Sequence, residues 1–398
     1  MRRRLLFLSN GPGEDSLAGR ILDRLLPWPE VEVHAWCMVG EGSAYRRRAI
    51  PLVGAPNLLP GHGLSLVNPR YLWNDLRAGW ITTHWRQYRT TRELRGRYDL
   101  AVAVGDVVPI AAASLAGIPF LFVGCAKSAY YGRGPGRYTR LEKYFLRRHC
   151  RMAFPRDRWT TDELAGAGVP ARYVGNPMMD DLEPTGESFG LPSDTCVITL
   201  LPGSRSDTLD NLRELLEMGP AIAAACPRPA HFLVAAHDDL DASALLLQPP
   251  EGWKATAPRP EERARGVALS VAHESGLGAI LVKGRFADAV LRAEVVIGLA
   301  GTANEQAIGL GRPVVAFPAR GFLGEAYVRM KARYYGPAVL TAARSAEAVA
   351  GAVRRIFVEP GLRETMVQAG RERMGGPGAS AAIAAEIRRG LETLESGA

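Results

Sequence analysis

The sequence predicts an α/β protein built from two Rossmann-like, doubly wound domains. The chain has 398 residues, which is long enough for two domains that each have a core. Short apolar runs of strand length alternate with helical or loop segments in both halves. The stretch GNPMMDDLEPTGESFGLPSD, rich in Gly, Pro and acidic residues, separates the halves as a linker. We expect domains at 1–180 and 190–370, followed by a polar, Ala-rich helical tail at 371–398.

The predicted strands follow from these apolar runs, taken in chain order. Doubly wound domains bind ligands at the carboxyl ends of their strands, so the residues after each run are the candidates for function. In the first half the runs are Leu5–Leu8, Val31–Val39, Leu100–Val104, Pro119–Gly124, Arg151–Phe154 and Arg172–Val174. In the second half they are Cys196–Leu201, His231–Ala235, Gly278–Val282, Val295–Leu299, Val314–Phe317 and Ala338–Leu340.

Composition and charge indicate a soluble globular protein with an anionic partner. Apolar residues make up 47% and charged residues 23% of the chain, a soluble globular balance. No run approaches about 18 consecutive apolar residues, so no transmembrane helix is expected. The apolar stretch near the N-terminus is too short for a signal peptide, which predicts a cytoplasmic protein. The net charge of +8 favours an anionic partner: nucleotide phosphates, lipid headgroups or nucleic acid.

The five cysteines are odd in number and widely spaced, without a C-x-x-C pair or clustered histidines. This pattern supports neither a disulfide framework nor a zinc site. Buried free thiols are expected instead.

The first glycine-rich turn lies in LLFLSNGPGEDSLAGRILDRLL, between a strand and a helix. Gly11 and Gly13 fit a dinucleotide fingerprint, but Ser16 replaces its third glycine. Glu14 and Asp15 would repel a pyrophosphate at the helix N-terminus, so an NAD site is disfavoured. The two carboxylates either oppose the helix dipole or hold substrate hydroxyls.

A stronger phosphate loop opens the second half, in CVITLLPGSRSDTLDNLRELL. Gly203, Ser204 and Arg205 follow a strand, and a helix begins near Asp207. Free backbone N–H groups, a hydroxyl and a guanidinium are the groups that bind a pyrophosphate. The alternative is an ordinary turn with a solvated arginine.

A second nucleotide-side loop lies in VVIGLAGTANEQAIGLGRPVVAF. Small residues there let a ligand approach the backbone, and a Glu or Gln one turn into the helix can bind both hydroxyls of a ribose. Helix capping by Thr302 or Asn304 is the alternative. The candidate residues are Gly301, Thr302, Ala303, Asn304, Glu305 and Gln306.

The segments LLPGSR, VGNPMMD and GTANEQAIGLGRPVV resemble the lipid-A-disaccharide synthases, which are GT-B glycosyltransferases that use UDP-sugars. The resemblance implies two domains facing a central cleft: an acceptor-binding domain at 1–180 and a nucleotide-sugar domain at 190–370. GPGEDS resembles the family's Gly- and Glu-rich turn at the sugar. It implies an acceptor or sugar loop made by Gly11, Gly13, Asp15, Ser16 and Asn176.

The chain departs from the family at the ribose-binding residue. Counted back from the Pro of the PVV strand, the family's Glu falls on Gln306. Glu305 is one residue away and about 100° around the helix. We interpret the chain as a divergent relative, and lipid A is not assumed to be its product.

Sugar transfer needs a base for the acceptor hydroxyl and donors that stabilise the departing diphosphate. Asp106 directly follows a predicted strand, and the resemblance also points to an Asp in this region. Its alternative role is to cap the helix that begins near Val108. Glu14 is the second catalytic candidate. No D-x-D motif follows a strand, which predicts a metal-independent reaction without a cofactor.

The stretch 68–98 combines tryptophans and arginines, which suits an anionic membrane surface. Packing of an ordinary domain helix is the alternative. In the resembled family this region likewise carries the membrane-contacting, acceptor-binding surface. The candidate membrane contacts are Trp73, Arg77, Trp80 and Trp85.

The sequence therefore predicts a peripheral glycosyltransferase of glycolipid biosynthesis on the inner face of the cell membrane. It would move a sugar, of the HexNAc type, from a UDP-sugar to a lipid or lipid-linked acceptor, with inversion. Two alternatives stay open: a UDP-sugar 2-epimerase of the same architecture, and a non-catalytic nucleotide-sugar binding protein. Nucleic acid is not expected as a partner, because no recognised motif accompanies the charge. A homodimer is left open.

Overall fold

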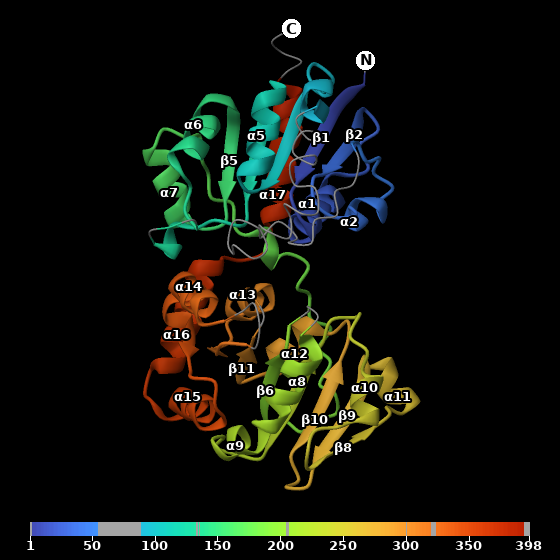
Figure 1. Ribbon diagram of the computed structural model, residues 1–398, viewed down its shortest axis with the longest axis vertical. Helices are drawn as coiled ribbons and strands as arrows, with labels where there is room; N and C mark the ends of the chain where they lie inside the picture. Colours follow the sequence, from blue (N-terminus) through green and yellow to red (C-terminus); the bar gives the residue numbers. More distant parts are fainter. Residues whose placement is uncertain are drawn as a thin grey trace. The chain divides into compact units, whose positions relative to one another are not determined.

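The computed structural model describes residues 2–54, 89–132, 134, 136–203, 207–299, 301–319 and 324–393. It divides the chain into two compact units, which we describe separately (Figure 1). Unit 1 comprises Met1–Asp180 and Gly376–Ala398, and unit 2 comprises Asp181–Gly375. Several predicted site residues lie outside the described ranges, namely Trp73, Arg77, Trp80, Trp85, Ser204 and Arg205.

Unit 1 is organised around a five-stranded parallel sheet. Its strands are β1 (Arg3–Ser9), β2 (Val31–Cys37), β3 (Leu100–Gly105), β4 (Phe120–Gly124) and β5 (Cys150–Pro155), in the order β2-β1-β3-β4-β5. Strands covered on both faces read as continuous apolar runs, which is why the sequence located these five.

Helices cover both faces of the unit 1 sheet. Leu5 and Phe7 pack in one core with α1 (Pro12–Leu25) and α17 (Ala379–Glu392). Leu6 and Leu8 point the other way, into a core with α5 (Val107–Ala116), α6 (Arg140–His149) and α7 (Arg158–Gly166). The alternation follows from the two-residue period of a strand. Short elements complete the unit: α2 (Ser43–Arg46), η1 (Ala129–Tyr131) and η2 (Pro177–Met179).

The end of the chain is part of unit 1, whereas the sequence analysis treated 371–398 as a tail of its own. In Figure 1 helix α17 lies beside α1. Ile383, Ile387 and Leu391 on α17 are buried in the core that contains Leu17. Asp180 accepts hydrogen bonds from the backbone N–H groups of Gly378 and Ser380. The buried apolar stripe of α17 explains why this helix packs instead of extending freely.

We expect Asp180→Ala to lower the free energy of unfolding by about 1–2 kcal/mol, because the Asp180 carboxylate caps the N-terminus of α17 from about two hundred residues away along the chain. Urea unfolding would measure the change. Glu183→Ala, which removes an exposed carboxylate a few residues away, should change it by less than about 0.5 kcal/mol. Equal effects of the two substitutions would contradict the capping role.

Unit 2 has an eight-stranded sheet in the order β13-β12-β11-β6-β7-β10-β9-β8. Six strands are parallel, and β8 and β9 form an antiparallel edge. The strands are β6 (Cys196–Leu201), β7 (Ala230–Ala235), β8 (Trp253–Thr256), β9 (Val267–His273), β10 (Gly278–Val282), β11 (Val295–Gly298), β12 (Val314–Ala316) and β13 (Val339–Thr341).

Helices pack on both faces of this sheet as well. The helices are α8 (Thr208–Glu217), α9 (Gly219–Ala224), α10 (Ser243–Leu247), α11 (Pro260–Ala264), α12 (Phe286–Arg292), α13 (Thr302–Gly309), α14 (Glu325–Tyr335), α15 (Ala346–Val358) and α16 (Leu362–Met374), with η3 (Gly336–Ala338). Ile198 and Leu200 of β6 lie in the core with α8, α9, α15 and α16, whereas Val197 lies in a second core with Ala289 of α12.

The predicted fold class is confirmed, since both units are α/β structures around mainly parallel sheets. One predicted strand is wrong: Arg172–Val174 forms no strand, and only Ala171 makes an isolated bridge, to Ala153. The antiparallel pair β8 and β9 was not predicted. Within the described ranges, no helix combines the length and apolarity that a membrane crossing requires.

Candidate functional site

In the unit 1 sheet, the side on which successive strands are added changes between β1 and β3. The chain continues from β1 to β2 on one side, while β3 lies on the other side, so the connections after β1 and β3 diverge. Such a switch point leaves a crevice at the carboxyl ends of the strands, where doubly wound domains bind ligands. Asn10 and Glu14 follow β1, and Asp106 follows β3. Two predicted catalytic residues thus meet at the switch point.

Asp106 caps helix α5 and also accepts hydrogen bonds from Asn10, which lies on the other side of the switch point. Its Oδ1 accepts from the Val108 N–H at 3.0 Å, which is the capping role that the sequence left open. The Asn10 Nδ2 lies 3.4 Å from both carboxylate oxygens. Burial raises the pKa of the Asp106 carboxyl, although the Val108 and Asn10 donors act in the opposite direction. Asn10 was missed by sequence reasoning, although its place directly after a strand end was a signal.

Glu14 lies in the first turn of α1, half-buried against the loops after β1 and β3. Burial, together with the charges of Asp106 and Asp15, raises the pKa of Glu14 to about 7. A Cβ added at Gly11 would lie 2.8 Å from Glu14 Oε2, and one at Gly105 would lie 2.9 Å from its Cγ. The two glycines therefore make the space that the Glu14 side chain occupies. A carboxyl with a pKa near neutral pH is suited to proton transfer.

Asp15 points into the protein and not toward the crevice. Its side chain is buried, and it accepts hydrogen bonds from the Ser9 hydroxyl at 2.6 Å and the Cys37 thiol at 3.2 Å. Ser9 is bonded in turn to the Tyr45 hydroxyl at 2.6 Å. Burial raises the pKa of Asp15 and, with the adjacent Asp15 charge, that of Cys37 to about 12. The carboxyl predicted to belong to the sugar loop is thus engaged in a buried network.

The other residues of the predicted sugar loop have different surroundings. Gly11 precedes α1 as its N-cap residue, and Gly13 is exposed. Ser16 is exposed, and its hydroxyl donates to the Pro12 carbonyl at 2.9 Å. Asn176 is buried and caps η2 by accepting from the Met178 N–H at 3.0 Å. Only Gly11 among these four lies against a catalytic candidate, namely Glu14.

Unit 2 has its own switch point, between β6 and β11. The two strands pair in parallel, with Gly298 opposite Leu201, and the Leu299 N–H donates to the Leu201 carbonyl at 3.0 Å. The loop that begins at Gly203 and the loop around Gly301 therefore leave the same edge of the sheet side by side. Gly203 has φ +105°, a conformation that favours glycine. The structure thus brings together the starts of the two nucleotide-side loops.

Helix α13 directs its polar residues in different directions. Asn304 is buried, and its Nδ2 donates to the Gly298 carbonyl at 3.0 Å, which ties α13 to β11. Glu305 is 1% exposed and forms an ion pair with Lys331 Nζ at 2.7 Å. Gln306 is half-buried, Ala303 is half-buried and Thr302 is exposed. The predicted ribose-binding pair is therefore split, with Glu305 facing inward.

Helix α14 contributes residues that sequence reasoning missed. Lys331 pairs with Glu305, and the Tyr335 hydroxyl donates to the Gly301 carbonyl at 3.0 Å. No short-range pattern signals these contacts, because they join residues 26 and 34 positions apart. A small pocket at this place is lined by residues that include Gly298, Leu299, Asn304, Tyr327, Lys331 and Tyr335. In the part of the chain that the structure describes, no group of three His, Cys, Asp or Glu side chains could hold a metal ion.

Comparison with known sequences shows distant homology. No protein-family profile matches the chain. The lipid-A-disaccharide synthase of Myxococcus xanthus (strain DK1622) is 26% identical over 281 residues, which cover 66% of each chain. That of Azoarcus sp. (strain BH72) is 30% identical over 207 residues, covering 50% of this chain and 46% of the relative. The matches span about half to two thirds of these relatives. The chain is thus a distant homologue of lipid-A-disaccharide synthases.

Comparison with solved structures shows the GT-B fold. The calicheamicin glycosyltransferase CalG4 has a TM-score of 0.60 at 15% identity, covering 98% of both chains. Acinetobacter baumannii MurG has a TM-score of 0.57 at 14% identity, covering 97% of this chain and 99% of its own. The UDP-GlcNAc 2-epimerase from Neisseria meningitidis, solved with UDP-GlcNAc bound, has a TM-score of 0.55 at 12% identity, covering 98% and 100%. The predicted GT-B architecture is confirmed.

Proposed function

We propose that this protein is a peripheral membrane glycosyltransferase that moves a sugar of the HexNAc type from a UDP-sugar to a lipid or lipid-linked acceptor. The proposal is supported mainly by the residues and loops that lie at the switch point of each sheet. In unit 1 the switch point holds Glu14 and Asp106, and in unit 2 it holds the starts of both nucleotide-side loops. The distant homology to lipid-A-disaccharide synthases supports the choice of donor and acceptor class.

The proposed reaction assigns a task to each unit. The acceptor hydroxyl oxygen attacks the anomeric carbon of the donor sugar while the bond from that carbon to the diphosphate oxygen breaks, so the configuration inverts. Glu14 takes the hydroxyl proton, because its pKa of about 7 matches this task better than the more fully bonded Asp106. The charge of Asp106 helps to raise the pKa of Glu14, and Asp106 with Asn10 orients the acceptor. The loop Gly203–Arg205 stabilises the charge on the departing UDP, so no metal is required.

The acceptor would reach unit 1 from the inner surface of the cell membrane. The tryptophan- and arginine-rich stretch around Trp73, Arg77, Trp80 and Trp85 suits such a surface. The excess of basic residues in the whole chain would also attract the protein to an anionic membrane surface. Flotation with vesicles of anionic and of neutral lipid would test this part of the proposal.

The donor site is tested by thermal unfolding with UDP, UDP-GlcNAc, NAD and ADP. A ligand at about 100 times its dissociation constant adds about 2.7 kcal/mol to the free energy of unfolding. We expect the uridine ligands to stabilise the protein and Arg205→Ala to abolish this effect. Arg213→Ala, which removes a half-buried arginine from α8, should leave it intact. Stabilisation by NAD without stabilisation by UDP would overturn the proposal.

The chemistry is tested by the release of UDP from UDP-GlcNAc in the presence of a lipid-linked acceptor. Transfer releases one UDP for each product molecule. A UDP-sugar 2-epimerase would convert the sugar with at most traces of free UDP, and a binding protein would release none. Release that depends on the acceptor therefore distinguishes the proposed activity from both alternatives.

A further inference from the structure

A pair of aromatic rings lies on the same edge of the unit 1 sheet as the carboxyl pair. Tyr130 belongs to η1, which follows β4, and Trp159 belongs to the first turn of α7, which follows β5. The ring centroids lie 4.8 Å apart with an interplanar angle of 79°, an edge-to-face contact. The Trp159 residue is 50% exposed. Next to it, the exposed Arg158 lies over the ring of Tyr173.

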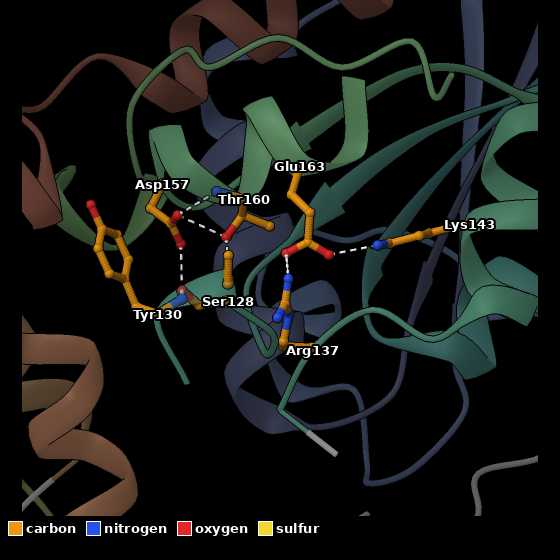
Figure 2. Close-up of polar contacts among 8 residues, drawn as sticks. Ser128, Tyr130, Arg137, Lys143, Asp157, Thr160 and Glu163 are labelled. Atoms are coloured by element: carbon orange, nitrogen blue, oxygen red, sulfur yellow. Dashed lines mark hydrogen bonds and ion pairs between the residues drawn. The ribbon is translucent and has the colours of Figure 1, made fainter. Parts of the chain in front are cut away.

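Buried hydrogen bonds fix the backbone on which the two rings are mounted. Figure 2 shows Ser128, Asp157 and Thr160 joined by their side chains. Asp157 accepts from the Ser128 hydroxyl at 2.7 Å and from the Thr160 N–H and hydroxyl at 2.8 and 2.7 Å. The Ala129 N–H donates to Thr160 at 2.8 Å, and the Tyr130 N–H donates to Ser128 at 3.1 Å. Bonds to a buried carboxylate are among the stronger ones, so η1 and the start of α7 form one rigid piece.

Ion pairs also join α7 to α6 and to the segment that precedes α6. Glu163 of α7 accepts from Lys143 of α6 at 2.5 Å and also pairs with Arg137 (Figure 2). Side chains that are ordered before a ligand arrives lose less entropy on binding, which favours affinity. The polar contacts therefore order the backbone of α7 that carries Trp159, and the ring of Tyr130 contacts its indole.

The distance of the rings from the carboxyl pair follows from the sheet. Asp106 follows β3, Tyr130 follows β4 and Trp159 follows β5, and these three strands are successive neighbours. Two inter-strand spacings are roughly 10 Å. A ligand that reaches from the rings to Asp106 therefore has about the size of a sugar with a substituent.

We propose that Trp159, held edge-to-face by Tyr130, forms a stacking platform for a pyranose ring of the acceptor. Calling the bound sugar the acceptor rests on the proposed function, whereas binding of a pyranose to these rings does not. The C–H groups on one face of a pyranose are weakly positive, and they pack on the negative face of an aromatic ring. Arg158 adds donors for hydroxyl or anionic substituents of that sugar.

The positions of the other exposed apolar residues in unit 1 favour a local sugar site over a continuous apolar surface for a hydrocarbon chain. Among the described residues of this unit, the other large apolar side chains that are exposed are Leu115, Leu141 and Tyr144. They lie on α5 and α6, and not on η1 or α7. A site for a hydrocarbon chain would need neighbouring apolar side chains around Trp159, but its neighbours in sequence are Arg158 and Thr160.

The test is saturation-transfer NMR with n-octyl N-acetyl-β-D-glucosaminide, which carries a pyranose and a chain in one probe. We expect the ring protons of the probe to receive saturation from the full-length protein. Trp159→Leu, which keeps apolar volume but removes the aromatic face, should lower that signal at least fivefold. Tyr130→Leu should lower it in the same direction. Tyr144→Ala removes an exposed aromatic ring from α6 and should leave the signal within twofold.

Several outcomes would overturn the platform. Saturation of the octyl protons alone would identify a hydrocarbon site. An equal loss in Tyr144→Ala would indicate nonspecific contact, and self-association that disappears in Trp159→Leu would identify a surface for a second copy of the chain. Because the probe binds without turnover, a protein that releases no UDP can still satisfy the test. Conversely, unchanged probe binding in Trp159→Leu, with acceptor-dependent UDP release intact, would overturn the platform alone.

Discussion

Replacing Glu14 with Gln is expected to lower the rate of sugar transfer by about 10²- to 10⁴-fold while the affinity for UDP stays unchanged. The amide keeps the shape of the side chain but cannot accept the proton of the acceptor hydroxyl. Because only the ionised carboxylate acts as a base, the wild-type rate should fall as the pH drops below about 7. The measurement is the pH dependence of acceptor-dependent UDP release.

Two further variants make this expectation specific. Glu30→Gln makes the same substitution at an exposed residue between α1 and β2 and should leave the rate unchanged. Asp106→Asn keeps an oxygen for the Val108 N–H and so preserves the cap of α5. If Asp106→Asn abolishes the limb of the pH profile near 7 and Glu14→Gln does not, the proton is accepted by Asp106.

The same Glu14→Gln substitution should stabilise the protein at alkaline pH. The pKa of Glu14 is raised from 4.5 to about 7, so the folded state holds a proton that the unfolded state has lost. The stability of the wild type therefore falls as the pH rises from 4.5 to 7, by up to about 3 kcal/mol. Gln avoids this penalty. The transfer rate of the variant should be low, while its free energy of unfolding should rise at pH 8 and change little at pH 4. This result would show that the variant is folded and lacks only the catalytic base.

The second large effect is expected at Lys331. Lys331→Met should lower the free energy of unfolding of unit 2 by about 3–5 kcal/mol, because it removes the ammonium group that pairs with the buried Glu305 carboxylate. Methionine keeps the apolar length of the side chain, so the change isolates the charge. Chemical denaturation at pH 7 would measure it.

A neighbouring ion pair provides the matched control for Lys331. Arg329 and Glu325 pair on the same helix, but both side chains are mostly exposed. Arg329→Ala should therefore cost less than about 1 kcal/mol. The double variant Glu305→Gln with Lys331→Met should recover part of the lost stability, since no charge is left buried. A cost below 1 kcal/mol for Lys331→Met alone would show that the pair does not stabilise α13.

Much of the fold was predictable because buried parallel strands leave a local signature. The five strands of unit 1 were located as apolar runs, with ends that differ by at most two residues from the observed ones. The antiparallel strand β9 was missed although VALSVAH alternates, because only continuous apolar runs were taken as strands. Arg172–Val174 was wrong because pairing with β5 is limited to one bridge at Ala171, and the chain leaves the sheet after it. The packing of α17 depends on its contact with α1, which lies more than 350 residues away in the chain.

The sequence by itself determined which residues stand at strand ends, and so it identified Glu14, Asp106 and the loops at Gly203 and Gly301 as candidates. Only the tertiary structure decided which of two adjacent residues faces the crevice. Neighbours on a helix differ by about 100°, so one of Glu14 and Asp15 must turn inward. That choice depends on where the sheet and Ser9 lie. The same holds for Glu305 and Gln306, because Lys331 on α14 pairs with Glu305 from a distant part of the chain.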